Sequence, residues 1–588
     1  MTDTKQSRLT ATLLCVTPPD ERQEQGIRAF LQKKYGEDVA LTIQQDSSLK
    51  SGFQLHVGSE VYDWSAKGRM EQFRQQVEQL VAKNTRKDII PLLRSSIDEF
   101  RLLAKSSEVG TVKSIGDGIA VVEGLEHAAY GEILMFDNGI KGMVQDLRRN
   151  ETGCILFDNA DDISAGSKVA RTGKTAGVPV GDAFLGRVVD ALGRPIDGGD
   201  AIPADGYRPV EEPAPGIIDR QSVDTPMETG LLSIDAMFPI GRGQRELIIG
   251  DRQTGKTAIA LDAMLNQKGK NVICVYVAIG QKASSVAQLV ENLRKRDAMD
   301  YCVVVSATAG EADTMQYIAP YAGCAMAEYY MHKGRDVLIV YDDLSKHAIA
   351  YRAMSLLLER APGREAYPGD VFYLHSRLLE RSAHLSDKLG GGSMTALPIV
   401  ETQAGDVSAY IPTNIISITD GQIFLESDLF FAGQRPAVNV GLSVSRVGGA
   451  AQTKATKKAT GSLRLDLAQY REMEVFTQFS SDLDDSTKEQ LHYGQGLMRI
   501  LRQKQYHPLS MHQQVIVLVC AMGHVLSKVA VKDVTDFRDA LLDHFEQEHS
   551  DLCRSLEDEK VLTDDMKQEI LRIAEAFLAA NAERFRKE

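Results

Sequence analysis

Residues 250–257 have the residue types and spacing that hold a phosphate chain. They fit the phosphate-loop pattern G-x-x-x-x-G-K-[ST] and follow the apolar run 247–249. In this pattern glycines let backbone N–H groups approach phosphate oxygens, the lysine reaches the terminal phosphates and the last hydroxyl binds magnesium. Residues 258–265 favour a helix whose N-terminus faces the anion. The sequence therefore predicts a site for ATP or ADP with Mg²⁺. The expected contacts are Gly250, Asp251, Arg252, Gln253, Thr254, Gly255, Lys256 and Thr257.

A pair of acidic residues, Asp342 and Asp343, directly follows the apolar run 337–341. A strand that ends in an aspartate, in a chain with a phosphate loop, is typical of a group that holds magnesium through water. The alternative role for such an acid is a helix cap. We expect Thr257 and Asp342 to form the metal-binding pair.

The composition describes a large, acidic chain. Its 588 residues, 43% of them hydrophobic, are enough for roughly three to five domains. The net charge of −14 argues against a general nucleic-acid binder. Seven cysteines without C-x-x-C spacing favour buried thiols in a reducing compartment over a disulfide framework. The polar residues 1–10 lack a signal region and the apolar run 515–526 is too short to span a bilayer, so we expect only indirect membrane association.

The first 85 residues are expected to form a small α/β unit that ends in a linker. Alternating apolar residues predict strands, and helical spacing predicts one helix near the start and a closing helix. The predicted strands are 11–16, 39–45 and 53–57, the first helix is 21–34, and the closing helix presents Met70, Phe73, Val77 and Leu80.

Four further regions follow. Residues 86–108 are expected to form a connecting amphipathic helix. In 109–178, glycines separate short β-rich runs, which favours a β-barrel over the alternative of a flexible linker. In 179–455, strands and helices alternate around the phosphate loop, which predicts a RecA-like core with a mainly parallel sheet. Residues 456–588 have helical periodicity and predict a C-terminal helical domain. The expected fold class is multidomain α/β.

The segment 49–73 resembles the C-terminal part of the delta subunit of bacterial ATP synthases. It carries Gly58-Ser59-Glu60-Val61-Tyr62-Asp63-Trp64-Ser65-Ala66-Lys67-Gly68-Arg69, where the family usually has V-I-D-G-S-V-R-G-R-L. The departures are Tyr62, Trp64, Ala66, Lys67 and Met70. The resemblance implies a contact with a peripheral stalk, and the alternative is an unrelated extension.

Residues 86–588 resemble the alpha subunit of F-type ATP synthases. The stretches that carry the resemblance are 181–189, 250–257, 341–346, 362–373, 401–414 and 439–446. The Asp-Arg-Gln-Thr filling of the phosphate loop resembles alpha rather than the catalytic beta subunit, whose loop usually reads G-G-A-G-V-G-K-T.

The resemblance implies that the chain's own nucleotide site is non-catalytic. Catalytic relatives place a glutamate after the strand expected at 272–279, where this chain has Gln281. A neutral amide cannot accept the proton of the attacking water, and loss of that base should cost on the order of a hundredfold or more in rate. Glu401 is the alternative base, but the family gives it no such role. We therefore expect Mg-ATP that is hydrolysed slowly or not at all.

The resemblance places the chain's catalytic contribution in a neighbouring subunit. By its match to the motif 441–446, Arg446 is an arginine finger that reaches the beta site, where such a guanidinium is worth roughly a thousandfold or more in rate. The alternative for Arg446 is an ordinary surface ion pair. Ser417 resembles another interface position. Around the chain's own nucleotide, the resemblance indicates Gln281 and also Arg252, Gln253, Arg435, Pro436, Gln503 and Gln505, with Lys504 where the family more often has glycine.

The implied assembly is a rotary ATP synthase. In it, alpha alternates with beta in a hetero-hexamer around gamma, and the delta-like extension contacts a b-type peripheral stalk subunit. The implied location is peripheral, on the cytoplasmic face of the cell membrane, with ATP synthesis coupled to ion translocation. One alternative is an autonomous hexameric motor of the Rho or secretion-ATPase kind, which the acidic balance and Gln281 oppose. Another is a scaffold whose nucleotide site is inactive.

Overall fold

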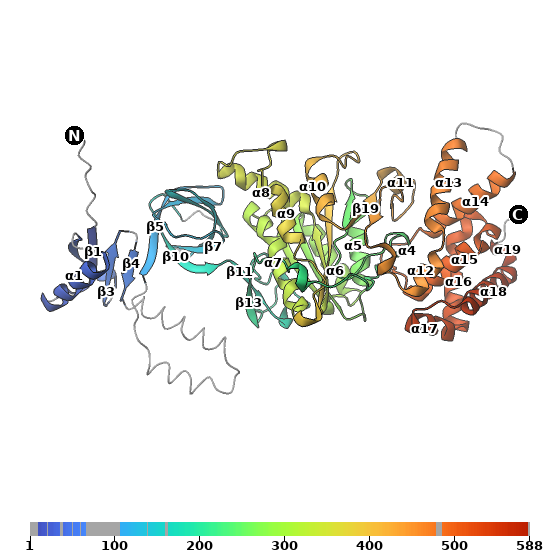
Figure 1. Ribbon diagram of the computed structural model, residues 1–588, viewed down its shortest axis with the longest axis horizontal. Helices are drawn as coiled ribbons and strands as arrows, with labels where there is room; N and C mark the ends of the chain where they lie inside the picture. Colours follow the sequence, from blue (N-terminus) through green and yellow to red (C-terminus); the bar gives the residue numbers. More distant parts are fainter. Residues whose placement is uncertain are drawn as a thin grey trace, which may run out of the picture. The chain divides into compact units, whose positions relative to one another are not determined.

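The computed structural model describes residues 10–19, 21–35, 39–49, 51–58, 60–65, 106–137, 139–158, 163–477 and 485–585 (Figure 1). It divides into two compact units, Met1–Ala176 and Gly177–Glu588. The predicted closing helix lies outside the described residues. Most of the predicted connecting helix over 86–108 does so too, and its last three positions belong to a strand instead.

The N-terminal part of the first unit is a small sheet covered by one helix. It contains β1 (Thr10–Cys15), α1 (Glu21–Tyr35), β2 (Ala40–Gln45), β3 (Phe53–Val57) and β4 (Glu60–Asp63). Strand β1 pairs with β2 in parallel and with β3 antiparallel, and apolar side chains such as Leu13, Leu31 and Leu55 form the core.

Part of the segment that precedes the predicted closing helix forms strand β4. Residues 60–63 pair antiparallel with both β3 and β5. The rings of Tyr62 and Trp64 stack at a centroid distance of 5.9 Å, and Trp64 also packs on Phe53 at 4.8 Å. Two residues that depart from the delta pattern therefore form an aromatic cluster on this sheet.

A closed β-barrel follows. Its strands are β5 (Ser106–Gly116), β6 (Ile119–Glu123), β7 (Glu132–Phe136), β8 (Lys141–Leu147), β9 (Glu151–Leu156) and β10 (Lys168–Thr175). The strand order is β5-β6-β9-β8-β7-β10, and β10 also pairs with β5, which closes the sheet on itself. Closure leaves no free edge, and buried residues such as Val112, Val144 and Val169 fill the interior.

The second unit is built around an eight-stranded sheet in the order β12-β16-β15-β17-β18-β14-β19-β20. The neighbouring pairs are parallel except β19 with β20. The strands are β12 (Val188–Asp190), β14 (Leu247–Gly250), β15 (Val272–Gln281), β16 (Cys302–Thr308), β17 (Asp336–Asp342), β18 (Ser393–Glu401), β19 (Gly421–Leu425) and β20 (Val444–Ser445). Helices cover the faces of the sheet, so strands such as β15 are apolar on both sides (Figure 1).

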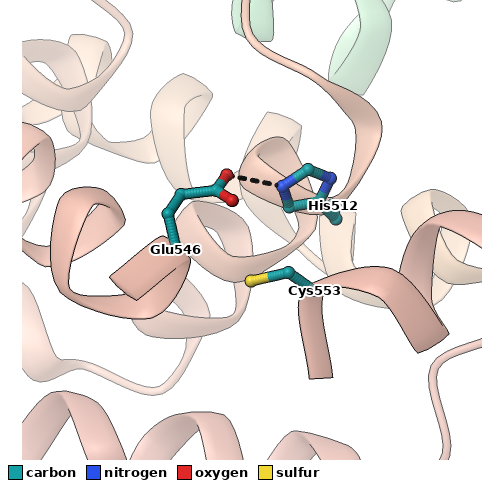
Figure 2. Close-up of side chains that lie close together, drawn as sticks. All are labelled: His512, Glu546 and Cys553. Carbon is teal, nitrogen blue, oxygen red and sulfur yellow. Dashed lines mark hydrogen bonds and ion pairs between the residues drawn. The ribbon is translucent and has the colours of Figure 1, made fainter. Parts of the chain in front are cut away.

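The last part of the chain is helical, as predicted. Its helices are α12 (Lys454–Thr460), α13 (Leu463–Thr477), α14 (Asp485–Ile500), α15 (Met511–Met522), α16 (Val534–Glu548), α17 (Ser550–Glu559), α18 (Asp564–Ala580) and α19 (Ala582–Phe585). The predicted boundary at 455–456 therefore falls inside a helix. Helices α15, α16 and α17 bring His512, Glu546 and Cys553 together (Figure 2).

The fold class is thus the predicted one: a barrel, a largely parallel sheet flanked by helices, and a helical C-terminal region. All seven cysteines are buried and unpaired. Within the described part of the chain, every helix is too short or too polar to cross a membrane.

Candidate nucleotide-binding site

The phosphate loop connects the carboxyl end of β14 to α5 (Lys256–Leu265). Gly250 is confined, because a Cβ there would lie 2.6 Å from the Leu425 carbonyl oxygen. Gly255 precedes the helix with φ +95°, in the left-handed region that glycine tolerates best. Gln253 has φ +63° and an exposed side chain. The loop therefore turns sharply into the N-terminus of α5, and the N-terminus of a helix is where backbone N–H groups bind phosphate.

Asp251 anchors the loop to two neighbouring segments. Its carboxylate accepts hydrogen bonds from the Thr402 hydroxyl at 2.6 Å, the Gly405 N–H at 2.9 Å and the Ser427 hydroxyl at 3.0 Å. Burial opposes ionisation of Asp251, but these hydrogen bonds hold its pKa below the ordinary value. Within the loop, the Thr254 hydroxyl donates to the Asp251 carbonyl oxygen at 2.8 Å. Asp251 thus shapes the loop, whereas Thr254 both shapes the loop and lines the cavity beside it.

Lys256 is buried and folds back onto the loop. Its ammonium donates to the carbonyl oxygens of Gly250 at 2.9 Å and Asp251 at 2.5 Å. Burial lowers its pKa, and the carboxylates of Glu401, Asp343, Asp342 and Asp251 oppose that shift. A cation placed among carboxylates at the start of a helix is suited to a polyphosphate that carries its own divalent cation.

Asp342 gathers three side chains at the end of β17. One of its carboxylate oxygens accepts from the Thr257 hydroxyl at 2.7 Å and from the Tyr276 hydroxyl at 2.6 Å. The other accepts from the Gln281 amide at 2.9 Å. The structure therefore brings the predicted metal pair, Thr257 and Asp342, into direct contact. These oxygen donors are the kind that Mg²⁺ prefers, so the residues present fit a magnesium-bound nucleotide.

The neighbouring acids are occupied by cations. Asp343 pairs with the Lys346 ammonium at 2.7 Å, and burial raises its pKa to about 6. Glu401 receives the guanidinium of Arg252 at 3.1 Å, although the Arg252 side chain is 81% exposed. The hydroxyl of Ser345 accepts from the Glu401 backbone N–H at 2.9 Å. Glu401 therefore lies in an ion pair beside the loop.

A cavity of about 720 Å³ opens next to the loop, which is large enough for a nucleotide. Arg435, Pro436, Gln503 and Gln505, the four residues expected around the nucleotide, line this cavity. The Arg435 guanidinium lies 4.3 Å from the centroid of the Phe430 ring. A smaller space lined by Gln281, Gln505 and Tyr506 adjoins it.

The wall of this cavity also holds residues that the sequence did not indicate, among them Phe430 and Arg502. Arg502 donates to the Gln434 side chain at 3.0 Å. Neither residue belongs to a motif with a chemical signature, and both reach the cavity only through the fold. Tyr276, which bonds Asp342, was also missed, and its signal was an aromatic hydroxyl in an otherwise apolar strand.

Gln503 is fixed by backbone groups. Its amide nitrogen donates to the carbonyl oxygens of Gly230 at 2.7 Å and His507 at 2.9 Å, and its amide oxygen accepts from Leu232 N–H at 3.1 Å. The loop that contains Gly230 is also hydrogen-bonded to Asp235, which lies on α4 (Leu232–Met237). Gln503 is therefore positioned by a loop whose own hydrogen bonds extend beyond the cavity.

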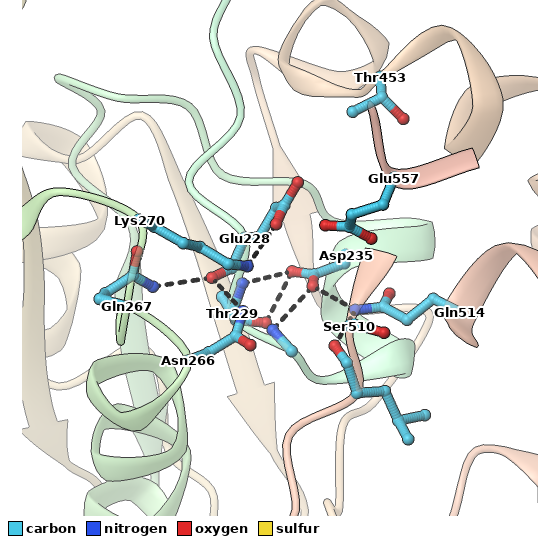
Figure 3. A network of polar contacts seen from close by, with 12 residues as sticks. Glu228, Thr229, Asp235, Asn266, Gln267, Lys270, Thr453, Ser510, Gln514 and Glu557 are labelled. Atoms are coloured by element: carbon cyan, nitrogen blue, oxygen red, sulfur yellow. Dashed lines mark hydrogen bonds and ion pairs between the residues drawn. The ribbon is translucent and has the colours of Figure 1, made fainter. Parts of the chain in front are cut away.

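Asp235 is the centre of a buried polar network that joins α4 to α15 (Figure 3). One carboxylate oxygen accepts from the Thr229 N–H at 2.9 Å and the Thr229 hydroxyl at 2.7 Å. The other accepts from Gly230 N–H at 2.9 Å and the Gln514 amide at 2.8 Å. Burial raises the pKa of Asp235, and these donors oppose the shift. The network links the cavity wall to the helical domain.

Comparison with known proteins gives the family. The sequence is 58% identical to the ATP synthase subunit alpha of Clostridium botulinum strain Hall over 483 residues, which are 82% of this chain and 96% of that protein. It is 56% identical to the ATP synthase subunit alpha of Clostridium kluyveri over 490 residues, 83% of this chain and 97% of that protein. The chain belongs to the ATP synthase alpha subunit family. The alpha resemblance seen in the sequence is thereby confirmed.

Family profiles agree with this alpha-subunit architecture. The ATP synthase alpha/beta family profiles match residues 105–173 as the beta-barrel domain, 230–445 as the nucleotide-binding domain and 452–577 as the C-terminal domain. Residues 1–77 match a profile described as ATP synthase delta (OSCP) subunit. The chain therefore joins an alpha subunit to a delta-like segment, as the sequence predicted.

The proposed finger of this alpha subunit, Arg446, lies at the surface of the nucleotide-binding domain, directly after β20. Its N–H donates to the Asp420 carbonyl oxygen at 2.9 Å. Asp420 follows α10 (Tyr410–Ile418), which carries the exposed Ser417 near its end. The predicted interface residues Ser417 and Arg446 therefore lie on adjoining segments. Both are far from the phosphate loop in the sequence.

A buried acid lies beneath this surface. Glu246 is fully buried, accepts from the Gln244 amide at 2.7 Å, and has one oxygen without a hydrogen-bond donor among the described residues. Burial and the Asp420 carboxylate raise its pKa well above the ordinary value, and the Arg446 charge opposes them. Glu246 is thus a buried carboxyl with a raised pKa, next to the pair β19–β20 that Arg446 follows.

Proposed function

We propose that this chain is the nucleotide-binding, non-catalytic alpha subunit of a rotary F-type ATP synthase. Thr257 and Asp342 would hold the Mg²⁺ of ATP or ADP, and Lys256 with the loop N–H groups would hold the phosphates. The bound magnesium would neutralise phosphate charge. The observation that supports a non-catalytic site is Gln281, whose amide donates to Asp342 at 2.9 Å and offers no base toward the cavity.

The proposed catalytic contribution is made in trans by Arg446. Its side chain is exposed, so it is free to enter a site on a neighbouring subunit. The backbone hydrogen bond to Asp420 fixes the base of the side chain, and Asp420 is itself held by Arg245 at 2.8 Å. A guanidinium on a rigid strand end suits stabilisation of a transferring phosphoryl group in a beta subunit.

The proposed partners follow from the alpha assignment. They are a beta subunit that alternates with this chain in a hetero-hexamer, a gamma subunit, and a b-type peripheral stalk subunit that meets the delta-like extension. The resulting complex would couple ATP synthesis to ion transport from the cytoplasmic face of the cell membrane, with this chain peripheral. The match of residues 1–77 to the delta (OSCP) profile supports the stalk contact.

Reconstitution with a beta partner tests the trans role. We expect Arg446→Lys to lower steady-state ATP hydrolysis by roughly a thousandfold, because lysine lacks the bidentate fork. The matched control is Arg572→Lys, a side chain that is 71% exposed and pairs with Glu569 on α18. Unchanged hydrolysis with Arg446→Lys would overturn the finger assignment. Appreciable turnover by the purified chain alone would instead favour an autonomous hexameric motor.

A further inference from the structure

Three helices of the C-terminal domain direct a nitrogen, a sulfur and an oxygen ligand toward one point. His512 is the second residue of α15, Glu546 lies in the last turn of α16, and Cys553 lies in α17. One potential ligand atom from each of the three lies within 4.8 Å of the other two (Figure 2). Three elements that are remote in sequence therefore contribute one donor each.

The imidazole of His512 is oriented by carboxylates on both sides. Its Nε2 lies 2.8 Å from Glu546 Oε1, and its Nδ1 lies 2.8 Å from Glu557 Oε2. Glu557 also accepts the His512 backbone N–H at 3.1 Å. A carboxylate on Nδ1 fixes the tautomer that leaves Nε2 available to a cation, which is the arrangement found behind many histidine ligands of metals.

Glu546 and Cys553 are also placed to act as ligands. The Gln513 amide donates to Glu546 Oε1 at 3.0 Å, which holds that carboxylate near the ring. Cys553 is 4% exposed, and its thiol makes only a long contact with the Phe545 carbonyl oxygen at 3.7 Å. An ion pair between His512 and the two glutamates does not require a sulfur atom at this position, whereas a thiophilic cation requires one as a ligand.

We propose that His512, Glu546 and Cys553 form a Zn²⁺-class metal site that cross-links α15, α16 and α17. Imidazole, thiolate and carboxylate are the ligand types of zinc, whereas Mg²⁺ and Ca²⁺ take oxygen ligands. Three protein ligands leave a fourth tetrahedral position for water. Glu557 is a positioning residue that acts through the His512 ring.

Binding requires a modest rearrangement. Ligands of a tetrahedral zinc ion lie about 3.3 to 3.6 Å apart, given bond lengths of about 2.0 to 2.3 Å. Nε2 and Glu546 Oε1, at 2.8 Å, must therefore separate slightly, and the Glu546 side chain has room to do so because it is 43% exposed. The Cys553 sulfur, which lies within 4.8 Å of the other two ligand atoms, must approach by up to about 1 Å. The thiol releases a proton to solvent as the cation binds, and a protonated imidazole releases the proton on Nε2, so affinity rises with pH.

The test is metal binding by the full-length chain after removal of metals with a chelator. We expect one equivalent of Zn²⁺ by elemental analysis after dialysis, and a thiolate-to-metal charge-transfer band when Co²⁺ is used instead. Cys553→Ser should abolish the band and weaken Zn²⁺ binding at least tenfold. Glu557→Gln should weaken it by about 10- to 100-fold while the band remains. Cys520→Ser, a buried cysteine of α15, is the matched control and should leave both unchanged.

The wild-type Co²⁺ spectrum does not depend on whether any variant folds. A wild-type chain that retains no zinc and shows no charge-transfer band with Co²⁺ would refute the site and leave a histidine held by two carboxylates. Zinc that stays bound with equal affinity in Cys553→Ser would also refute it.

Discussion

Replacement of Asp235 by asparagine tests whether the buried network of Figure 3 supports the nucleotide cavity. An amide has one acceptor and one donor group, whereas four donors point at the carboxylate: the Thr229 N–H and hydroxyl, the Gly230 N–H and the Gln514 amide. The Gln514 amide can rotate to present its oxygen, which has no donor among the described residues, with loss of its hydrogen bond to the Leu509 carbonyl oxygen. The Gly230 N–H cannot move in this way, so it is left facing another donor.

The cost follows from these contacts. A buried donor without an acceptor costs about 1 to 3 kcal/mol, and the hydrogen bonds that remain lose the strengthening that a charged acceptor gives. Removal of a buried charge offsets part of this loss, since burial already raises the pKa of Asp235. We expect a net destabilisation of about 2 kcal/mol. That value corresponds to roughly 30-fold faster hydrogen exchange at amides that open with this region.

The assay is hydrogen–deuterium exchange of α4 and α15, followed by a nucleotide titration. Because the Gly230 carbonyl holds Gln503, we also expect nucleotide affinity to fall by about 2- to 30-fold. Asp297→Asn makes the same chemical change at a side chain that is 76% exposed and should have little effect. Exchange in α4 and α15 that changes less than about threefold, or no more than in the control, would refute the reasoning.

Three further outcomes are expected. Gln281→Glu should speed single-turnover hydrolysis at the chain's own site by up to about 100-fold, against the repulsion between the new carboxylate and Asp342. An unchanged rate would show that the missing base does not limit hydrolysis. Burial raises the pKa of Glu246 in the folded chain, so its contribution to stability is fully present below the ordinary glutamate pKa and is lost as pH rises through the pKa of the folded state. The thermal midpoint of Glu246→Gln should therefore exceed that of wild type more at pH 8 than at pH 5. Gly494→Ala should destabilise the helical domain by about 1 to 2 kcal/mol in thermal unfolding, because its Cβ would lie 2.2 Å from the Tyr470 ring and this outweighs the gain in helix propensity.

The sequence predicted those parts of the site that are contiguous in the chain. The phosphate loop, the strand before it and the helix after it form one motif, and Asp342 ends a largely apolar strand, so local patterns suffice. The hydrogen bond between Thr257 and Asp342 joins residues 85 positions apart, yet the motif implied that they share a cation. Parallel strands bring such ends together.

The remaining features depend on tertiary structure. Phe430 and Arg502 reach the cavity only through the fold, and no residue pattern marks them. Strand β4 has four residues, too few to show a period, and its pairing with β3 and β5 decides its conformation. The network around Asp235 joins positions separated by up to 279 residues, so its partners were not visible in the sequence.

The burial of every cysteine has a practical consequence for fluorescence experiments. Thiol-reactive dyes require an exposed sulfur, so the native chain should react slowly and needs no cysteine removal before labelling. A single cysteine at Ile217, a position that is 93% exposed, would then carry the dye alone. Pairs of such positions would allow single-molecule distance measurements on an otherwise unaltered chain.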